Sequence, residues 1–169
     1  GTGSLLEKKV DSINVAKFPI MEWTWMISKL PDVEWEENTS QDDFAVRIEL
    51  VFDYKGNRYN PLNIIRKGFI TTFFRRSLPE VVICYVWAAG VPVGRSYISP
   101  SNKRIIVIPV ESGHGMQNIW IEEERNIQKD FDELIGIKRL VIKKIRIRCD
   151  TENSLSNAES GIKKILLKK

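Results

Sequence analysis

The sequence is poor in the residues that bind transition metals. Its 169 residues include one histidine, His114, and two cysteines, Cys84 and Cys149, which form no C-x-x-C pair. Zinc and iron sites use several imidazole or thiolate ligands, so we expect no metal site of this kind. Each cysteine lies in an apolar, strand-like segment, which favours buried thiols over a disulfide.

Long apolar runs are missing as well. No segment approaches the roughly 20 apolar residues that a membrane-spanning helix needs, so we expect no membrane span. No signal peptide opens the chain, and residues 1–4 are interpreted as a tag remnant or disordered start. The hydrophobic fraction of 43% and the charged fraction of 28% are typical of a globular protein, and we expect one domain over residues 5–169.

The net charge is +4, and the excess lies near the end of the chain. From Lys138 onward there are ten Lys and Arg residues against three Asp and Glu residues. Such a surface can attract phosphate groups or acidic polysaccharide. No aromatic residues alternate with these basic residues, although base stacking needs them. Nucleic acid is therefore disfavoured as a partner, and a solvated strand face with a basic tail is the simpler interpretation.

Apolar and polar residues alternate along much of the chain, which is typical of half-buried strands. Strands are predicted over residues 19–31, 44–54, 81–90, 103–113, 119–125, 140–150 and 161–169. The segment 81–90 has hardly a polar residue, so we place it in the middle of a sheet. Pro109 indicates an edge or a bulge in the next strand. Residues 35–43 and 55–63 are expected to be loops, and 68–80 fits a helix and a strand equally well.

One helix is predicted, over residues 127–135. Asn126 is a suitable N-cap, apolar residues recur on one side of the helix, and Gly136 stands where helices commonly end. Several strands with a single short helix indicate an all-β domain. We expect an antiparallel β-sandwich of jelly-roll type.

The segment 113–127 gathers His114 and three consecutive glutamates, which gives it the look of an active site. In a strand, Glu122 and Glu124 project to one side and Glu123 to the other. The acid and base of a glycosidase approach the sugar from opposite sides, so two parallel side chains on one strand do not suit catalysis. No catalytic residue is assigned. We expect His114 to lie in an exposed turn and Glu123 to pair with Arg125.

Calcium is a weaker alternative among the cofactors. Asp42 and Asp43 end one loop, and a later segment supplies Asp150, Glu152 and Asn153. Oxygen ligands of this kind suit calcium, but the chain has no EF-hand spacing. The simpler interpretation is that these acidic side chains cap helices or stabilise turns of the backbone.

The aromatic residues point to a ligand. Sugars stack on exposed aromatic rings while Arg, Asp or Asn hold their hydroxyl groups, and this chain has five tryptophans. Tyr85 and Trp87 share one face of their strand. We predict a site made of Tyr85, Trp87, Arg47 and Arg125 on one sheet face. Trp23 and Trp25 are expected in the core, which is also the alternative for Trp87.

Five segments in order resemble the bacterial family called domain of unknown function 3047. They are PIMEWTWMISKLP, DDFAVRIELVFD, CYVWAAGVPVG, IWIEEERNIQKDFDELIG and CDTENS. The resemblance implies a jelly-roll sandwich similar to carbohydrate-binding modules, exported or periplasmic, with no assigned activity. The family has strands before its W-x-W strand, for which the residues before Pro19 leave little room. The matched positions are Trp23, Trp25, Asp43, Arg47, Tyr85, Trp87, Trp120, Glu123, Arg125 and Asp150.

The favoured interpretation is a non-catalytic β-sandwich that binds carbohydrate or a similar polar ligand. A protein-interaction or structural module, whose aromatic residues fill the core, is the alternative. A hydrolase is the least favoured of the three, since it needs a second carboxylate opposite Glu123 or Glu124.

Overall fold

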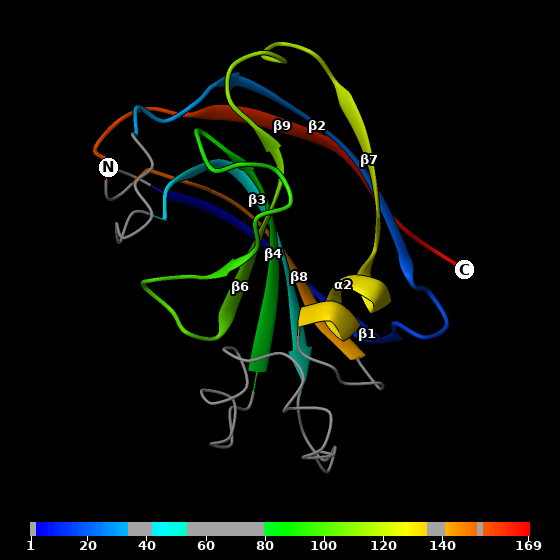
Figure 1. Cartoon of the computed structure of the whole chain (residues 1–169). Coiled ribbons are helices and arrows are strands. Elements are labelled where there is room, and N and C mark those ends of the chain that lie inside the picture. The colour runs from blue at the N-terminus through cyan, green and yellow to red at the C-terminus, as the bar shows by residue number, and fades with distance from the viewer. Residues whose placement is uncertain (1–2, 34–41, 54–79, 135–140, 152–153) are drawn as a thin grey trace.

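The computed structural model describes residues 3–33, 42–53, 80–134, 141–151 and 154–169, which form two facing sheets and one short helix (Figure 1). The elements are β1 (Gly3–Asn14), β2 (Ile20–Lys29), β3 (Phe44–Asp53), β4 (Glu80–Ala88), β5 (Tyr97–Ile98), β6 (Ile105–Ser112), β7 (Ile121–Asn126), α2 (Ile127–Leu134), β8 (Val141–Asp150) and β9 (Glu159–Lys168). The prediction of an all-β sandwich with one short helix is confirmed. The jelly-roll connectivity remains a prediction.

The two sheets are unequal in width. The larger has six strands in the order β1-β8-β3-β4-β6-β5, and the smaller has three in the order β7-β2-β9. All neighbours are antiparallel except β4 and β6, which run parallel. The parallel pair departs from the purely antiparallel sheet that we expected. It arises because the chain leaves β4, forms the edge strand β5 and then returns between the two as β6.

The core fills the space between the sheets, and alternation in β2 explains how it forms. One side of β2 carries Met21, Trp23, Trp25 and Ile27, all fully buried or nearly so. These side chains face the even-numbered residues of β3 and the odd-numbered residues of β4. A second apolar cluster, with Val51, Val82 and Cys84, lies on the opposite face of the large sheet. The large sheet is thus buried on both faces at β4, which is its predicted central position.

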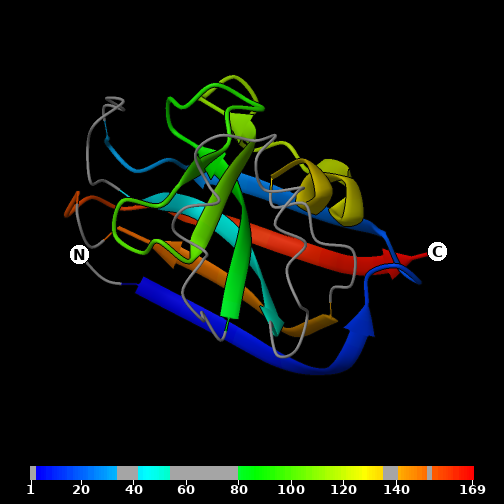
Figure 2. The same cartoon turned by 60° about the horizontal axis from the view of Figure 1, so that its bottom comes forward.

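Strand β1 was not predicted. It forms the edge of the large sheet by pairing with β8, and Gly3 and Ser4 already take part in this ladder (Figure 2). Most of its side chains are exposed, so no apolar alternation marks it in the sequence. A bulge between Lys9 and Ile13, with Ser12 at a positive φ of 48°, interrupts the pairing. Partnership with β8, rather than local pattern, makes this segment a strand.

Helix α2 follows β7 directly and closes one end of the sandwich (Figure 1). The Asn126 side chain accepts a hydrogen bond from the Lys129 backbone N–H at 2.9 Å, which confirms the predicted N-cap. Phe131 is fully buried against Phe52, with ring centroids 5.2 Å apart. The helix stop at Gly136, the loops around 35–41 and 55–63, and the ambiguous segment 68–79 lie outside the described residues.

Strand β6 contains Pro109 next to a register shift in its pairing with β4, between Val86 and Trp87. A proline has no N–H for the ladder, and a bulge tolerates this loss. The predicted irregularity is confirmed. The Pro109 carbonyl accepts a hydrogen bond from Gly94 N–H at 3.0 Å, which ties the β4–β5 connection to the sheet.

Replacing Phe131 by Ala should destabilise the fold strongly. The side chain is fully buried, and such a truncation loses apolar burial and leaves a cavity. We expect a decrease of about 3–5 kcal/mol in the free energy of unfolding, measured by urea denaturation. The control is Lys129→Ala on the exposed side of the same helix, which should change stability by less than about 0.5 kcal/mol. Equal losses in the two variants would contradict this packing.

Candidate functional site

The four residues predicted to bind a ligand do not share one face. Tyr85 and Trp87 project from β4 into the core between the sheets. Arg47 projects from β3 on the opposite face of the large sheet. Its cross-strand partner there is Val86 of β4, and Cys84 lies on the same face of that strand. Arg125 lies at the inner edge of β7, near Tyr85 but not near Arg47. The structure therefore places Arg125 near Tyr85, keeps Trp87 on the same face of β4 as Tyr85, and separates Arg47 from them.

The rings of Tyr85 and Trp87 are enclosed by other aromatic rings. Both side chains have 0% exposure. Trp23 stacks on Tyr85 with centroids 5.4 Å apart, and Trp25 packs against Trp87 at 5.8 Å. The Trp87 indole N–H donates to the Gly113 carbonyl at 3.2 Å. In this arrangement neither ring offers a face to a sugar, and the prediction that Trp23 and Trp25 lie in the core is confirmed.

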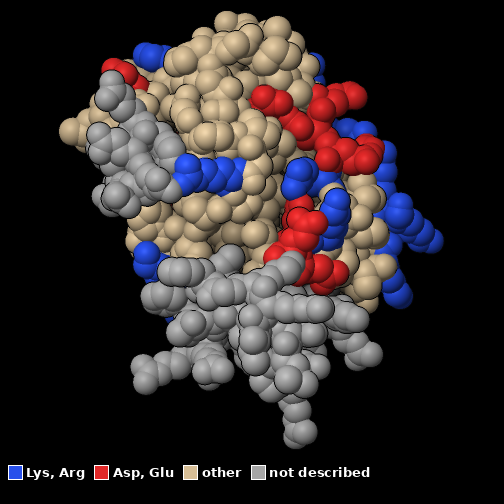
Figure 3. All heavy atoms as spheres, viewed as in Figure 1, with Lys and Arg blue, Asp and Glu red and all other residues tan. Residues whose placement is uncertain are grey.

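Arg125 and Asp130 form an ion pair at the open edge of the sandwich. Two nitrogens of Arg125 bind the Asp130 carboxylate, at 2.5 and 3.1 Å, and the Tyr85 hydroxyl donates to the same carboxylate at 2.8 Å. Arg125 was expected to pair with Glu123. Its hydrogen-bonded partner is instead Asp130 in the first turn of α2, although its charge still acts on Glu123. Figure 3 shows acidic and basic side chains side by side over β7 and α2. The Asp130 carboxylate thus joins β4, β7 and α2.

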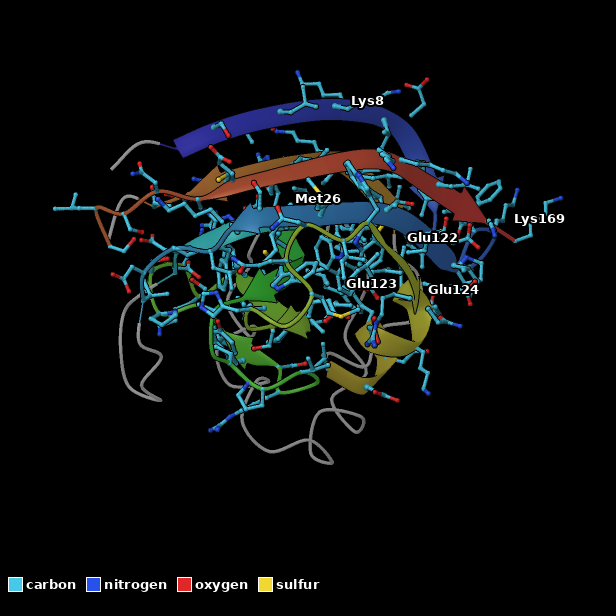
Figure 4. The ribbon with its side chains drawn as sticks, turned by 90° about the horizontal axis from the view of Figure 1, so that it is seen from above. Lys8, Met26, Glu122, Glu123, Glu124 and Lys169 are labelled. Atoms are coloured by element: carbon cyan, nitrogen blue, oxygen red, sulfur yellow. The ribbon has the colours of Figure 1, made fainter. Side chains whose placement is uncertain are left out.

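Glu123 faces a second carboxyl group, that of Glu111 on β6. Its carboxylate accepts a hydrogen bond from the Trp25 indole N–H at 3.2 Å, and it also interacts with Glu111 both as a like charge and as a hydrogen-bond partner. Partial burial, and then the Glu111 charge, raise the pKa of Glu123 to about 7. Glu123 can therefore hold a proton near neutral pH. Glu122 and Glu124 project outward, as predicted (Figure 4).

Arg47 lies in a buried ionic network. Its guanidinium is within 4 Å of three carboxylates: Asp150 at 2.7 Å, Glu49 at 3.5 Å and Asp42 at 3.9 Å. The Asp42 carboxylate also accepts hydrogen bonds from the hydroxyls of Ser99 and Ser101, each at 2.7 Å. Two of the acids considered for calcium, Asp42 and Asp150, thus surround a cation that the chain itself supplies.

The other residues considered for metals are dispersed. Asp43 accepts a hydrogen bond from the Ser154 backbone N–H, and Glu152 and Asn153 lie outside the described residues. His114 is exposed in a turn, as expected. The described ranges contain no group of three or more His, Cys, Asp or Glu side chains arranged to hold a metal ion. Cys84 is a buried free thiol, whereas Cys149 is only half-buried.

The outer face of the small sheet presents the exposed tryptophan that the predicted site lacks. Trp120 is 39% exposed and lies across Gly161 of β9, where an added Cβ would stand 2.9 Å from the indole ring. Only glycine allows the ring to lie this close to the strand. The Lys163 ammonium sits 4.0 Å from the ring centroid, within range of a cation–π contact. Trp120 is thus held against the sheet while remaining partly open to solvent.

Polar side chains continue this outer face beside Trp120. In register, Thr24 stands between Glu122 and Lys164, and Glu22 stands beside Glu124. They surround a shallow hollow of about 300 Å³. Carboxylates accept hydrogen bonds, an ammonium group donates them and a hydroxyl does both. This face can therefore bind a ligand that carries several hydroxyl groups.

Comparison with known proteins gives a family but no characterised relative. The model of a family described as "Protein of unknown function (DUF3047)" matches residues 1–166. No curated protein and no solved structure matches the chain significantly. Among the described residues, no helix is both long enough and apolar enough to span a membrane.

Removing the buried charge of Arg47 should destabilise the chain. Arg47→Met removes the buried cation of this network, while the partly exposed Arg146 and Arg148 still reach Glu49 and Asp150. Removing one partner of a buried ion pair costs about 3–5 kcal/mol. The matched variant is Arg146→Met, whose side chain is 25% exposed and should contribute at most about 1 kcal/mol. Urea denaturation of both variants measures the difference. A loss no greater for Arg47→Met than for Arg146→Met would refute the network's role.

The Glu111–Glu123 contact predicts how stability depends on pH. The pKa of Glu123 is raised above its unfolded value of about 4.5, so the folded chain binds more protons between these two pKa values. The free energy of unfolding should therefore fall as pH rises from about 4.5 through 7. The fall should be on the order of 1 kcal/mol, because Glu123 is half exposed.

The variant Glu123→Gln should remove this part of the pH dependence, while Glu122→Gln on the outer face should keep it. Urea denaturation at pH 5 and at pH 8 measures the slope. If the free energy of unfolding changes equally in wild type and Glu123→Gln between the two pH values, Glu123 does not hold the proton.

Proposed function

This chain belongs to the DUF3047 family of proteins of unknown function, and we propose that it is a non-catalytic β-sandwich that binds carbohydrate. The ligand lies on the outer face of the small sheet, with Trp120 as the stacking surface. The observation that carries the proposal is the partly exposed indole of Trp120, held in place against Gly161.

A fixed aromatic ring favours sugar binding for a physical reason. The indole ring loses little conformational freedom on binding, because Gly161 and the surrounding strand already restrict it. A sugar presents an apolar C–H face that packs on such a ring, and the release of water from both surfaces is favourable. Lys163, now over the ring, must move aside and can then donate to a hydroxyl group.

The polar neighbours of Trp120 supply orientation. Glu122 and Thr24 lie on adjacent strands of the same face, and Lys164 completes the row on β9. Together they offer acceptors and donors to neighbouring hydroxyl groups of one sugar unit. The strand alternation that buries Trp23 and Trp25 on the inner face is what places these polar groups on the outer one.

Hydrolysis is less well supported, although Glu123 does face a second carboxyl group. The carboxyl groups of a retaining glycosidase stand about 5 Å apart, and those of an inverting enzyme stand further apart still, because the sugar lies between them. Glu111 and Glu123 instead interact directly as hydrogen-bond partners. A substrate would therefore have to separate the two groups before it could lie between them.

A glycan array with the wild-type chain tests the proposal, followed by calorimetry with the saccharide that binds best. Trp120→Ala should weaken binding at least tenfold, equivalent to about 1.4 kcal/mol, because the stacking surface is lost. Gly161→Ala keeps the indole but should also weaken binding, because the new Cβ pushes the ring off the strand.

The control is Trp120→Phe, which keeps an aromatic face and should retain part of the affinity. Circular dichroism of each variant checks that the fold is intact. Binding to no saccharide on the array, or equal affinity in wild type and Trp120→Ala, would show that this face does not bind carbohydrate.

A further inference from the structure

The outer face of the small sheet carries a second apolar platform besides Trp120. Leu166 of β9 pairs in register with Glu22 of β2, so its side chain projects to the same outer side as that of Glu22. Leu166 is 38% exposed, whereas its neighbours Ile165 and Leu167 pack against the core. The face therefore presents apolar surface at two separate points.

The strand register gives the separation of the two platforms. Trp120 lies over Gly161, and Gly161 pairs with Met26 of β2 (Figure 4). Leu166 pairs with Glu22, four residues from Met26 on the same strand. At the rise of a strand, four residues span about 13 Å. A single pyranose ring is less than half as long, so one sugar unit cannot contact both platforms, whereas three consecutive units of an extended chain can.

Polar side chains occupy the stretch between the two platforms. Thr24 stands midway between Met26 and Glu22 on β2, with Lys164 on one side and Glu122 on the other. The last two are exposed, and their side chains form no ion pair or hydrogen bond with the residues that the structure describes. Thr24, Lys164 and Glu122 thus form a polar row across the sheet, free to bond with the middle unit of a bound chain.

The order apolar, polar, apolar along one sheet face suits an extended saccharide. In a chain joined through equatorial bonds, as in β-1,4-linked glucose, each unit is turned over relative to the one before. The first and third units therefore present the same side to the protein, and they can pack on the two platforms while the second meets the polar row. A chain joined through an axial bond, as in α-1,4-linked glucose, curves away from a row of this kind.

We propose that the ligand of this face is an extended, β-linked saccharide of at least three units, which lies along the strands of the small sheet. One unit stacks on Trp120, the next bonds with the polar row, and the third packs on Leu166. The inference rests on the proposed carbohydrate function, and it adds the length and the linkage of the ligand.

Calorimetry with a series of chain lengths tests the inference. The probes are β-1,4-linked oligosaccharides of glucose, mannose and N-acetylglucosamine, each of one to six units. In the series that binds, the tetrasaccharide should bind at least tenfold more tightly than the disaccharide, because only the longer chain reaches both platforms. The α-1,4-linked tetrasaccharide of glucose should bind at least tenfold more weakly than the best of the β-linked tetrasaccharides.

Two leucines provide matched variants. Leu166→Ser removes the second platform, so it should weaken binding of the tetrasaccharide at least tenfold and leave binding of the disaccharide unchanged. A disturbed sheet would instead weaken both. The control is Leu6→Ser, since Leu6 is 67% exposed and lines, together with Ile147, a groove of about 700 Å³ between β1 and β9. This variant should leave both affinities unchanged.

Backbone amide signals in proton–nitrogen NMR spectra give a reading that needs no variant. The tetrasaccharide should shift the signals of both Gly161 and Leu166. The disaccharide, which stays on Trp120, should shift the signal of Gly161 and leave that of Leu166 in place.

Several results would overturn the inference while the carbohydrate function stands. They are equal affinity for disaccharide and tetrasaccharide, equal affinity for α-linked and β-linked tetrasaccharides, and unchanged tetrasaccharide binding in Leu166→Ser. Weaker binding in Leu6→Ser alone would place the saccharide in the groove between β1 and β9. Binding to no saccharide of any series or on the glycan array would remove the carbohydrate function and this inference with it.

Discussion

The contact between aromatic rings across the two sheets is the interaction on which the structure depends. Trp23 and Trp25 of β2 pack on one another at 5.3 Å between centroids, and they meet Tyr85 and Trp87 of β4. These four rings are among the largest fully buried side chains in the described part of the chain. They set the separation of the sheets. The Trp25 and Trp87 indole N–H groups and the Tyr85 hydroxyl are hydrogen-bonded, whereas the buried Trp23 indole N–H has no partner.

The polar groups around this core are accordingly tied in pairs and networks. Tyr85 reaches Asp130, and Trp25 reaches Glu123. On the other face of the large sheet, Arg47 balances a set of buried acids. Groups that are buried and paired in this way have little left to offer a ligand. Within the described part of the chain, the outer face of the small sheet, with Trp120, remains available, as does the groove beside β9.

Much of the fold could be predicted from the sequence, because alternation reports directly which side of a strand is buried. It identified β2, β3 and the central position of β4, and the Asn126 cap located the start of α2. The site could be predicted only in part. The same alternation that buries Trp87 would also fit a ring on a binding face, and only the position of the second sheet distinguishes the two. β1 was missed because pairing with β8, not its own pattern, makes it a strand. The contact of Glu111 with Glu123 depends on how the two sheets meet, so the spacing of residues within one strand does not predict it.

The central claim is that the buried tryptophans build the fold while Trp120 meets the ligand. The indole N–H signals in proton–nitrogen NMR spectra test it most directly, during titration with soluble oligosaccharides of glucose, mannose and N-acetylglucosamine. The account predicts that one of these sugars shifts the Trp120 signal and leaves those of Trp23, Trp25 and Trp87 in place. Shifts at Trp25 or Trp87 with an unchanged Trp120 signal, or no shift with any sugar, would contradict it.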